Sequence, residues 1–308
     1  MLDKFIDAGG NFIDTANIYG KWLPEGTNIS EIILGEWLQE RGNRDEIIIG
    51  TKGGHPNLSS MDQPRLDRED IIQDLNESLD SLKTDYIDIY WLHRDDENKP
   101  VSEILDILNE QVEKGKIRYF CCSNWSVDRI KKAQNYAQEQ DLESFVANQM
   151  RWSLAEPNLE AIEDETLVAM NDQCYKYHQE NNFTAIPYSS QAKGFFTKLH
   201  QYQGNVDKLN QNLKEVYGNE KNLKRYQRLV ELSNYLSRSV SEIVLGYLIS
   251  QPFPVIPITG FSKESQLEDS IRGADLILNQ QALNYLDMGD GRGEKEIING
   301  LSIFKKTD

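Results

Sequence analysis

Four side chains able to support proton transfer follow three apolar runs in the first third of the sequence. Asp14 lies in the run NFIDT, and Tyr19 comes five residues later. Lys52 follows the run IIIGT, and His93 follows YIDIYWL. The runs are typical of strands, and the ends of successive parallel strands meet at one edge of a sheet. An ammonium group beside a phenol brings the phenol's pKa toward the range of an acid catalyst, so these residues predict acid–base chemistry.

Each of these residues alone has an ordinary structural explanation. A tyrosine after a strand usually packs, and a histidine at a strand end is more often a structural hydrogen-bonding group. Lysine and aspartate are rarely buried unless they pair, and Asp14 with Lys52 would form such a pair. Four polar groups at the ends of three adjacent strands are hard to explain as parts of a core. We therefore favour a reactive site.

Short apolar runs and amphipathic stretches alternate along the rest of the sequence. We expect strands at 12–15, 47–51, 87–92, 117–122, 145–149, 184–188 and 255–259. We expect helices at 30–41, 68–82, 102–114, 127–140, 164–180, 221–237, 239–250 and 263–271. Alternating strands and helices predict a parallel α/β sheet. Evenly spaced strands without a GxGxxG turn favour a (β/α)8 barrel of the TIM type over the alternative, an open doubly wound sheet.

The predicted barrel lacks its first strand in this sequence. The chain opens on a helical stretch at 2–8, followed by Gly9 and Gly10, and no strand can be read before it. We predict one domain over 1–308. It would carry a long connection at about 193–238, on the face of the barrel where ligands bind, and a polar tail at about 289–308.

Composition narrows the classes of partner. The 308 residues include 50 acidic and 33 basic side chains, and the net charge of −17 argues against a nucleic-acid partner. The three cysteines lack CxxC or CxxH spacing, which predicts neither a metal site nor a disulfide framework. The sequence has no apolar leader at its start and no long apolar run. We therefore predict a cytoplasmic protein without a membrane partner, and the oligomeric state stays open.

Six segments carry a resemblance to a known family. They are NFIDTANIYG, GTKGG, YIDIYWLHRDD, GKIRYFCCSNWS, ANQMRWSL and PYSSQAKGFF. In this order they resemble the aldo-keto reductase superfamily, and most closely its bacterial members, which include sugar and aryl-alcohol reductases. The resemblance covers nearly the whole chain. It implies an NAD(P)H-dependent oxidoreductase that reduces aldehyde or ketone carbonyls of small carbonyls, sugars or aryl aldehydes by hydride transfer.

The resemblance also implies a role for each residue of the first group. Tyr19 would be the general acid that protonates the carbonyl oxygen. Lys52 would make that phenol a stronger acid, and Asp14 would pair with Lys52. His93 would orient the carbonyl and help to stabilise developing negative charge. Trp22 follows Tyr19 closely and could line the substrate pocket.

The family's cofactor-binding positions also have counterparts here. The residues implied to hold the nicotinamide carboxamide are Ser123, Asn124 and Gln149. Those implied to stack on the ring and to cover the pyrophosphate are Tyr188, Ser189, Gln191, Lys193 and Gly194. Those implied at the adenosine end are Gly260, Ser262, Lys263, Gln266, Asp269 and Ser270. The resemblance predicts NADP(H), with NAD(H) as the alternative, since a phosphate held without arginine loses bidentate hydrogen bonds.

Two other functions remain as alternatives. The missing first strand favours a truncated relic, or a catalytically impaired or non-catalytic module that binds a nicotinamide nucleotide. The presence of Asp14, Tyr19, Lys52 and His93 counts against that alternative. A barrel hydrolase or isomerase would need a second well-placed carboxylate or a cluster of metal ligands, and the sequence shows neither.

Overall fold

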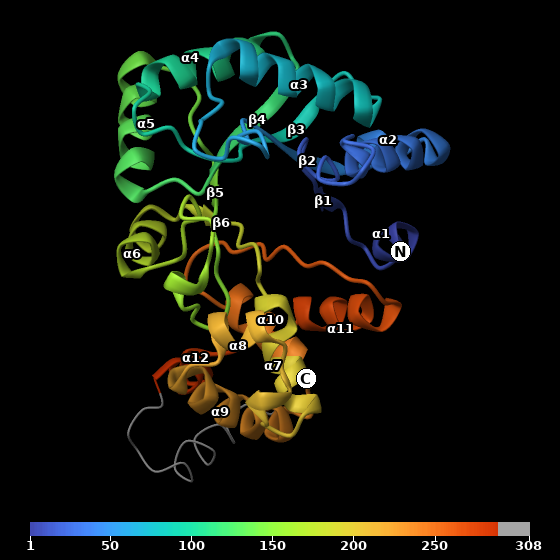
Figure 1. Cartoon of the computed structure of the whole chain (residues 1–308), viewed down its shortest axis with the longest axis vertical. Coiled ribbons are helices and arrows are strands. Elements are labelled where there is room, and N and C mark those ends of the chain that lie inside the picture. Colours follow the sequence, from blue (N-terminus) through green and yellow to red (C-terminus); the bar gives the residue numbers. More distant parts are fainter. Residues whose placement is uncertain (289–308) are drawn as a thin grey trace. The chain divides into compact units, whose positions relative to one another are not determined.

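The structure, a computed structural model, describes residues 1–288, which fall into two units (Figure 1). The N-terminal unit comprises residues 2–150 and 166–184. The C-terminal unit comprises Met1, residues 151–165 and the described residues from 185 onward. The single domain predicted over 1–308 stays a prediction, and the polar tail predicted at 289–308 lies outside the described residues.

A parallel sheet forms the centre of the N-terminal unit. Its strands are β1 (Phe12–Asp14), β2 (Ile48–Gly53), β3 (Ile87–Leu92), β4 (Ile117–Ser123) and β5 (Ala147–Gln149). They stand in sequence order, and β6 (Thr184–Ala185) comes next in that order. The sheet is curled into a half-barrel. A doubly wound sheet would reverse its order part-way, so the sequential order supports the predicted barrel-type fold.

Helices cover the outer face of β1–β4 (Figure 1). They are α2 (Ile29–Arg41), α3 (Arg68–Leu82), α4 (Val101–Glu113) and α5 (Val127–Gln140), and α6 (Asp172–Asn181) packs beside α5. In α3 the buried Ile71, Leu75, Leu79 and Leu82 recur at helical spacing, and this face packs toward the sheet. A short helix, α1 (Leu2–Asp7), precedes β1, and no strand lies before Phe12 in the described chain.

The C-terminal unit is mainly helical. After the short turn η3 (Ala192–Gly194) its helices are α7 (Phe195–Gln201), α8 (Gln211–Tyr217), α9 (Glu220–Leu236), α10 (Val240–Ile249), α11 (Glu264–Ala274) and α12 (Gln280–Met288). The apolar α10 packs against α7, α9 and α11. The connection predicted at 193–238 therefore consists largely of α7, α8 and α9.

Several predicted bounds are confirmed and others are wrong. The strand at 87–92 and the helices at 68–82 and 127–140 have their predicted ends. The helix predicted at 164–180 begins only at Asp172, because the Asn171 side chain caps it by accepting a hydrogen bond from the Cys174 N–H at 2.9 Å. The strand predicted at 184–188 ends at Ala185, and the one predicted at 255–259 shrinks to one bridge, between Ala185 and Val255. The N–H groups of Ile256 and Ile258 still donate to the carbonyls of Ala185 and Pro187, but Pro187 has no N–H to complete the ladder.

Candidate active site

The ends of β1, β2 and β3 bring Asp14, Lys52 and His93 to one edge of the sheet. Asp14 is the last residue of β1 and pairs with Gly50, while Lys52 pairs with Trp91. His93 directly follows β3, and its backbone N–H donates to the carbonyl of Gly53 at 2.8 Å. The parallel register therefore sets these side chains side by side, as the sequence predicts.

The Lys52 ammonium is the centre of this group. Its side chain is 1% exposed, and Nζ donates to Asp14 Oδ2 at 2.5 Å, to the carbonyl of Thr15 at 2.8 Å and to Tyr19 Oη at 3.5 Å. All three N–H bonds thus have partners. Burial by itself lowers the pKa of Lys52, but Asp14 and Tyr19 outweigh it and hold that pKa above its ordinary value. Lys52 therefore stays charged at neutral pH.

Asp14 supplies the opposite charge. Burial raises the pKa of Asp14 above its ordinary value, although Lys52 and a hydrogen bond from Gln149 oppose that rise. Gln149 Nε2 donates to Asp14 Oδ1 at 3.2 Å, so each carboxylate oxygen has a donor. This arrangement fixes the carboxylate against the ammonium and leaves little freedom to either group.

The Tyr19 ring has two aromatic neighbours, His93 and the exposed Trp22. The ring centroids of Tyr19 and His93 are 6.0 Å apart, and those of Tyr19 and Trp22 are 6.1 Å apart. Burial, followed by the charges of Lys52 and Arg94, holds the pKa of His93 well below its ordinary value. The imidazole is therefore neutral, with one N–H to donate. Its Nδ1 is buried and has no hydrogen-bond partner among the described residues.

The three residues predicted at the carboxamide adjoin the same group. Gln149 contacts Asp14, and Asn124 Nδ2 donates to the His93 carbonyl at 3.3 Å and to Ser123 Oγ at 3.1 Å. Asn124 has a left-handed backbone, with φ of 61°, and its Oδ1 accepts from the Val168 N–H at 3.1 Å. Ser123, Asn124 and Gln149 thus lie in the N-terminal unit with Asp14 and His93.

The residues predicted at the ring and the pyrophosphate belong to the C-terminal unit. Tyr188 forms a parallel bridge with Arg151, whose guanidinium carbon lies 5.7 Å from the tyrosine ring centroid. Gln191 Nε2 donates to Ser241 Oγ on α10 at 3.0 Å. The left-handed residues in this segment are Ser189, Ala192, Lys193 and Gly194, with φ of 52°, 49°, 53° and 76°. For non-glycine residues this conformation costs about 1–3 kcal/mol each, and such strain gathers at functional sites.

At the predicted adenosine end, the backbone N–H groups that could bind a phosphate already have hydrogen-bond partners. Gln266 Oε1 accepts from the backbone N–H of Ser262 at 2.8 Å and of Lys263 at 3.1 Å, which caps α11 from within. Ser270 Oγ donates to the Gln266 carbonyl at 2.9 Å, and Asp269 pairs with Arg272. Gly260 has no heavy atom within 4 Å of an added Cβ. A phosphate would have to displace the Gln266 amide to reach these N–H groups, so this end is a weaker fit than the nicotinamide end.

This set of strand-end residues is accompanied by a match to a family model. The model of the Aldo/keto reductase family covers residues 1–289. The chain belongs to the aldo/keto reductase family. The resemblance inferred from the motifs is therefore confirmed, and the oxidoreductase class comes with it.

Other aldo-keto reductases show how far this similarity extends. The chain is 28% identical over 305 residues to the aldo-keto reductase ausK of Emericella nidulans, covering 94% of this chain and 71% of that one. It is 28% identical over 294 residues to the uncharacterized oxidoreductase YrpG of Bacillus subtilis, covering 93% and 85%. The crystal structure of the thermostable aldo-keto reductase Tm1743, in complex with the inhibitor epalrestat, has a TM-score of 0.68 and 22% identity. It covers 93% of this chain and 84% of that one, and it shows the shared fold.

The structure adds a neighbour of the site, His55, and a contact of Gln149 that sequence reasoning missed. The His55 ring lies 4.7 Å from the His93 ring, and its Nδ1 lies 2.7 Å from the Pro56 carbonyl oxygen. The only sign of this neighbour in the sequence is that His55 comes three residues after Lys52. Gln149 was predicted at the cofactor, but its contact with Asp14 spans 135 residues and leaves no local trace in the sequence.

Within residues 1–288, no group of three or more His, Cys, Asp or Glu side chains could hold a metal ion, and no helix could cross a membrane.

Proposed function

We propose that this aldo-keto reductase reduces aldehyde or ketone carbonyls with a nicotinamide cofactor, and that Tyr19 is its general acid. The contact that supports this most is the buried Lys52 ammonium, which reaches both Asp14 and Tyr19 Oη. A charged lysine with a carboxylate behind it and a phenol in front stabilises the phenolate that forms when tyrosine gives up its proton.

The neutral His93 suits the second position on the substrate oxygen. A carbonyl oxygen within reach of Tyr19 Oη and a His93 N–H would accept both hydrogen bonds, and both strengthen as negative charge develops on that oxygen. Because the pKa of His93 lies well below its ordinary value, the ring donates a hydrogen bond without becoming a competing acid. The proton then moves from Tyr19 Oη to the oxygen, and the charge left on Tyr19 faces Lys52.

The bound nicotinamide cofactor would supply hydride to the carbonyl carbon. Ser123, Asn124 and Gln149 would hold its carboxamide, since two of them already contact His93 or Asp14. The strained segment that contains Ser189 and Lys193 would receive the pyrophosphate. NADP(H) remains the cofactor expected from the family resemblance. NAD(H) is the alternative, because Lys263 is the only base in the segment GFSKESQLEDS.

An exposed aromatic ring beside Tyr19 bears on the substrate class. The Trp22 ring is 60% exposed and packs edge-to-face with Tyr19, which provides a flat apolar surface next to the proposed acid. Related chains include an aryl-alcohol dehydrogenase of Pestalotiopsis microspora and a norsolorinic acid reductase of Aspergillus flavus, each 26% identical. Among small carbonyls, sugars and aryl aldehydes, we therefore favour aryl aldehydes as the first substrates to assay.

The test is turnover with Tyr19→Phe. Oxidation of NADPH and NADH would be followed by absorbance with a panel of aryl aldehydes, aliphatic aldehydes and sugars. The variant is expected to lose about 10²- to 10⁴-fold in kcat, which is the usual contribution of a general acid, while the Kd of the cofactor stays unchanged. Tyr136→Phe is the matched control, because the Tyr136 hydroxyl of α5 donates an exposed hydrogen bond to Asp106 of α4. Unchanged turnover in Tyr19→Phe would remove Tyr19 from the acid role. Cofactor binding without turnover on any carbonyl would favour the non-catalytic alternative.

A further inference from the structure

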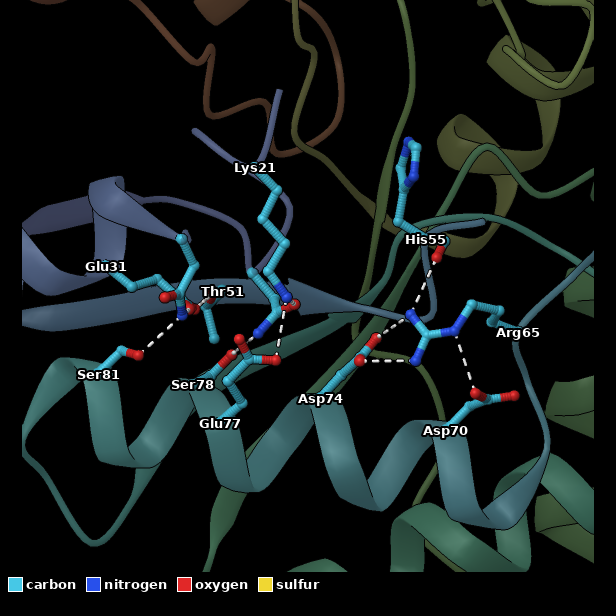
Figure 2. Close-up of polar contacts among 12 residues, drawn as sticks. Lys21, Glu31, Thr51, His55, Arg65, Asp70, Asp74, Glu77, Ser78 and Ser81 are labelled. Carbon is cyan, nitrogen blue, oxygen red and sulfur yellow. Dashed lines mark hydrogen bonds and ion pairs between the residues drawn. The ribbon is translucent and has the colours of Figure 1, made fainter. Parts of the chain in front are cut away.

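One side of α3 carries a row of polar side chains that meet the loops after β1 and β2 (Figure 2). The row, at helical spacing, consists of Asp70, Asp74, Glu77, Ser78 and Ser81. Side chains of residues 17, 21, 28 and 65, which belong to the two loops, bond to this row. Asp74 and Ser78 in this row are buried, so the row is more than the solvated polar face of an ordinary surface helix. The row therefore indicates that α3 anchors both loops.

The loop after β1 is attached on either side of Tyr19. Lys21 Nζ donates to Asn17 Oδ1 at 2.7 Å and to Glu77 Oε2 at 3.0 Å. Asn17 is 3% exposed, and its backbone N–H donates to the Lys52 carbonyl at 3.0 Å. The lysine thus joins the two ends of the short turn that carries Tyr19, and it joins both ends to α3.

The backbone of Tyr19 has one bond within the turn and one to the start of α2, where the Ser30 N–H donates to the Tyr19 carbonyl at 3.3 Å. The Tyr19 N–H bonds the Ala16 carbonyl at 3.0 Å, and the Lys21 N–H bonds the Ile18 carbonyl at 3.0 Å, both within the turn. Gly20 adopts a φ of 104°, which lets the chain leave the turn sharply. The contact between Tyr19 Oη and Lys52 Nζ is 3.5 Å, at the outer limit of a hydrogen bond. A shift of the turn by a fraction of an ångström would therefore separate the two groups.

We propose that Lys21 is a positioning residue, which with Glu77 holds the Tyr19 turn on α3 so that the phenol stays within reach of Lys52. This role rests on the proposed function of Tyr19 as the acid. Lys21 and Glu77 are 24% and 39% exposed, so the pair adds little to global stability. Its effect falls on the geometry of one turn. The loop after β2 is attached to the same row by Arg65, which bonds Asp74 at 2.9 Å and Asp70 at 3.0 Å (Figure 2).

The first experiment needs no turnover. Hydrogen–deuterium exchange of the peptide that spans 15–23 would be compared in the full chain, in Lys21→Met and in Glu77→Gln. Both variants are expected to exchange faster there and to match the wild type elsewhere. The matched control is Lys116→Met. Lys116 Nζ donates to Oδ1 of Asn76 at 2.6 Å, and Asn76 belongs to α3 but does not bond the Tyr19 turn. Equal exchange in the wild type and both variants would overturn the proposal.

The second experiment measures turnover in the same proteins. A misplacement of about 1 Å costs about 10²-fold in rate, so Lys21→Met and Glu77→Gln are expected to lower kcat by about tenfold to a hundredfold. KM and the Kd of the cofactor should stay unchanged, and the deuterium isotope effect on kcat should rise. Lys21→Arg should restore most of the rate. Glu77→Gln keeps the charge of Lys21, so a loss in that variant separates positioning from simple loss of a cation.

The outcomes are distinguishable. Faster exchange with an unchanged kcat would show that the turn is held but that the reaction does not need it, which overturns the positioning role. A loss in Lys21→Met without a loss in Glu77→Gln would assign the effect to charge and also overturn it. Absence of turnover in the wild type would reject the proposed function. The exchange measurement would then still decide whether Lys21 and Glu77 hold the turn.

Discussion

Replacing Lys52 by methionine tests the buried ion pair with Asp14. Lys52 is 1% exposed and Asp14 is 8% exposed, so the variant leaves a carboxylate buried without its cation. The variant can escape that state by protonating Asp14. The cost at pH 7 is then limited to about 1.4 kcal/mol for each pH unit above an ordinary aspartate pKa of about 3.9, which gives about 4 kcal/mol. Breaking a buried pair usually costs about 3–5 kcal/mol, in agreement with this limit.

The same reasoning fixes the pH dependence. Between about pH 4 and pH 7 the folded variant carries a proton on Asp14 that the unfolded chain has lost, so its stability falls as the pH rises. Urea unfolding of Lys52→Met should show the deficit relative to the wild type shrinking by up to about 1.4 kcal/mol per unit of acidification. The double variant Asp14→Asn with Lys52→Met should recover most of the loss at pH 7. A deficit below about 1 kcal/mol, or one that is the same at pH 5 and pH 7, would refute this account.

Two further predictions concern other charged groups in the N-terminal unit. Burial holds the pKa of His93 below its ordinary value, so the contribution of His93 to stability is present above about pH 6.5 and is lost as the pH falls, because the unfolded chain takes up a proton first. His93→Asn should therefore flatten the dependence of the free energy of unfolding on pH, measured by urea unfolding between pH 7.5 and pH 5. An identical pH dependence in both proteins would contradict this prediction. Asp74→Asn weakens the ion pair of Asp74 with Arg65, whose two side chains are 4% and 17% exposed, and should lower the free energy of unfolding by about 2 kcal/mol. The control is Glu110→Gln in the solvent-exposed pair of Arg68 with Glu110, which should leave Tm unchanged. Equal Tm values for the two variants would contradict an effect of burial.

The position of the proposed proton-transfer group could be read from the sequence because it depends on local patterns. Asp14, Lys52 and His93 each stand at the end of an apolar strand, and parallel pairing of consecutive strands then brings them to one edge. The strand at 87–92 has its predicted ends because it is a mainly apolar run, broken by Asp88, whose residues are almost all buried.

Contacts that join distant segments could not be predicted in the same way. Gln149 with Asp14 and Lys21 with Glu77 depend on which side of a strand or helix faces which loop, and nothing local encodes that choice. The wrong bounds have local causes that the apolar pattern does not show. The Asn171 side chain caps one helix, and Pro187 has no N–H with which to complete the ladder between the segments predicted at 184–188 and 255–259.

The four proposed proton-transfer groups all belong to the N-terminal unit, which also contains every residue that contacts them in the interactions described above. Three consecutive strands therefore encode the acid–base chemistry in about a third of the chain. The segments proposed to bind the phosphates and the adenosine lie in the other unit. During divergence, nucleotide preference can drift through changes near Lys193 or Gln266 without touching the proton-transfer group. On these proposed assignments, the reaction type and the choice of coenzyme would be set by separate parts of one polypeptide.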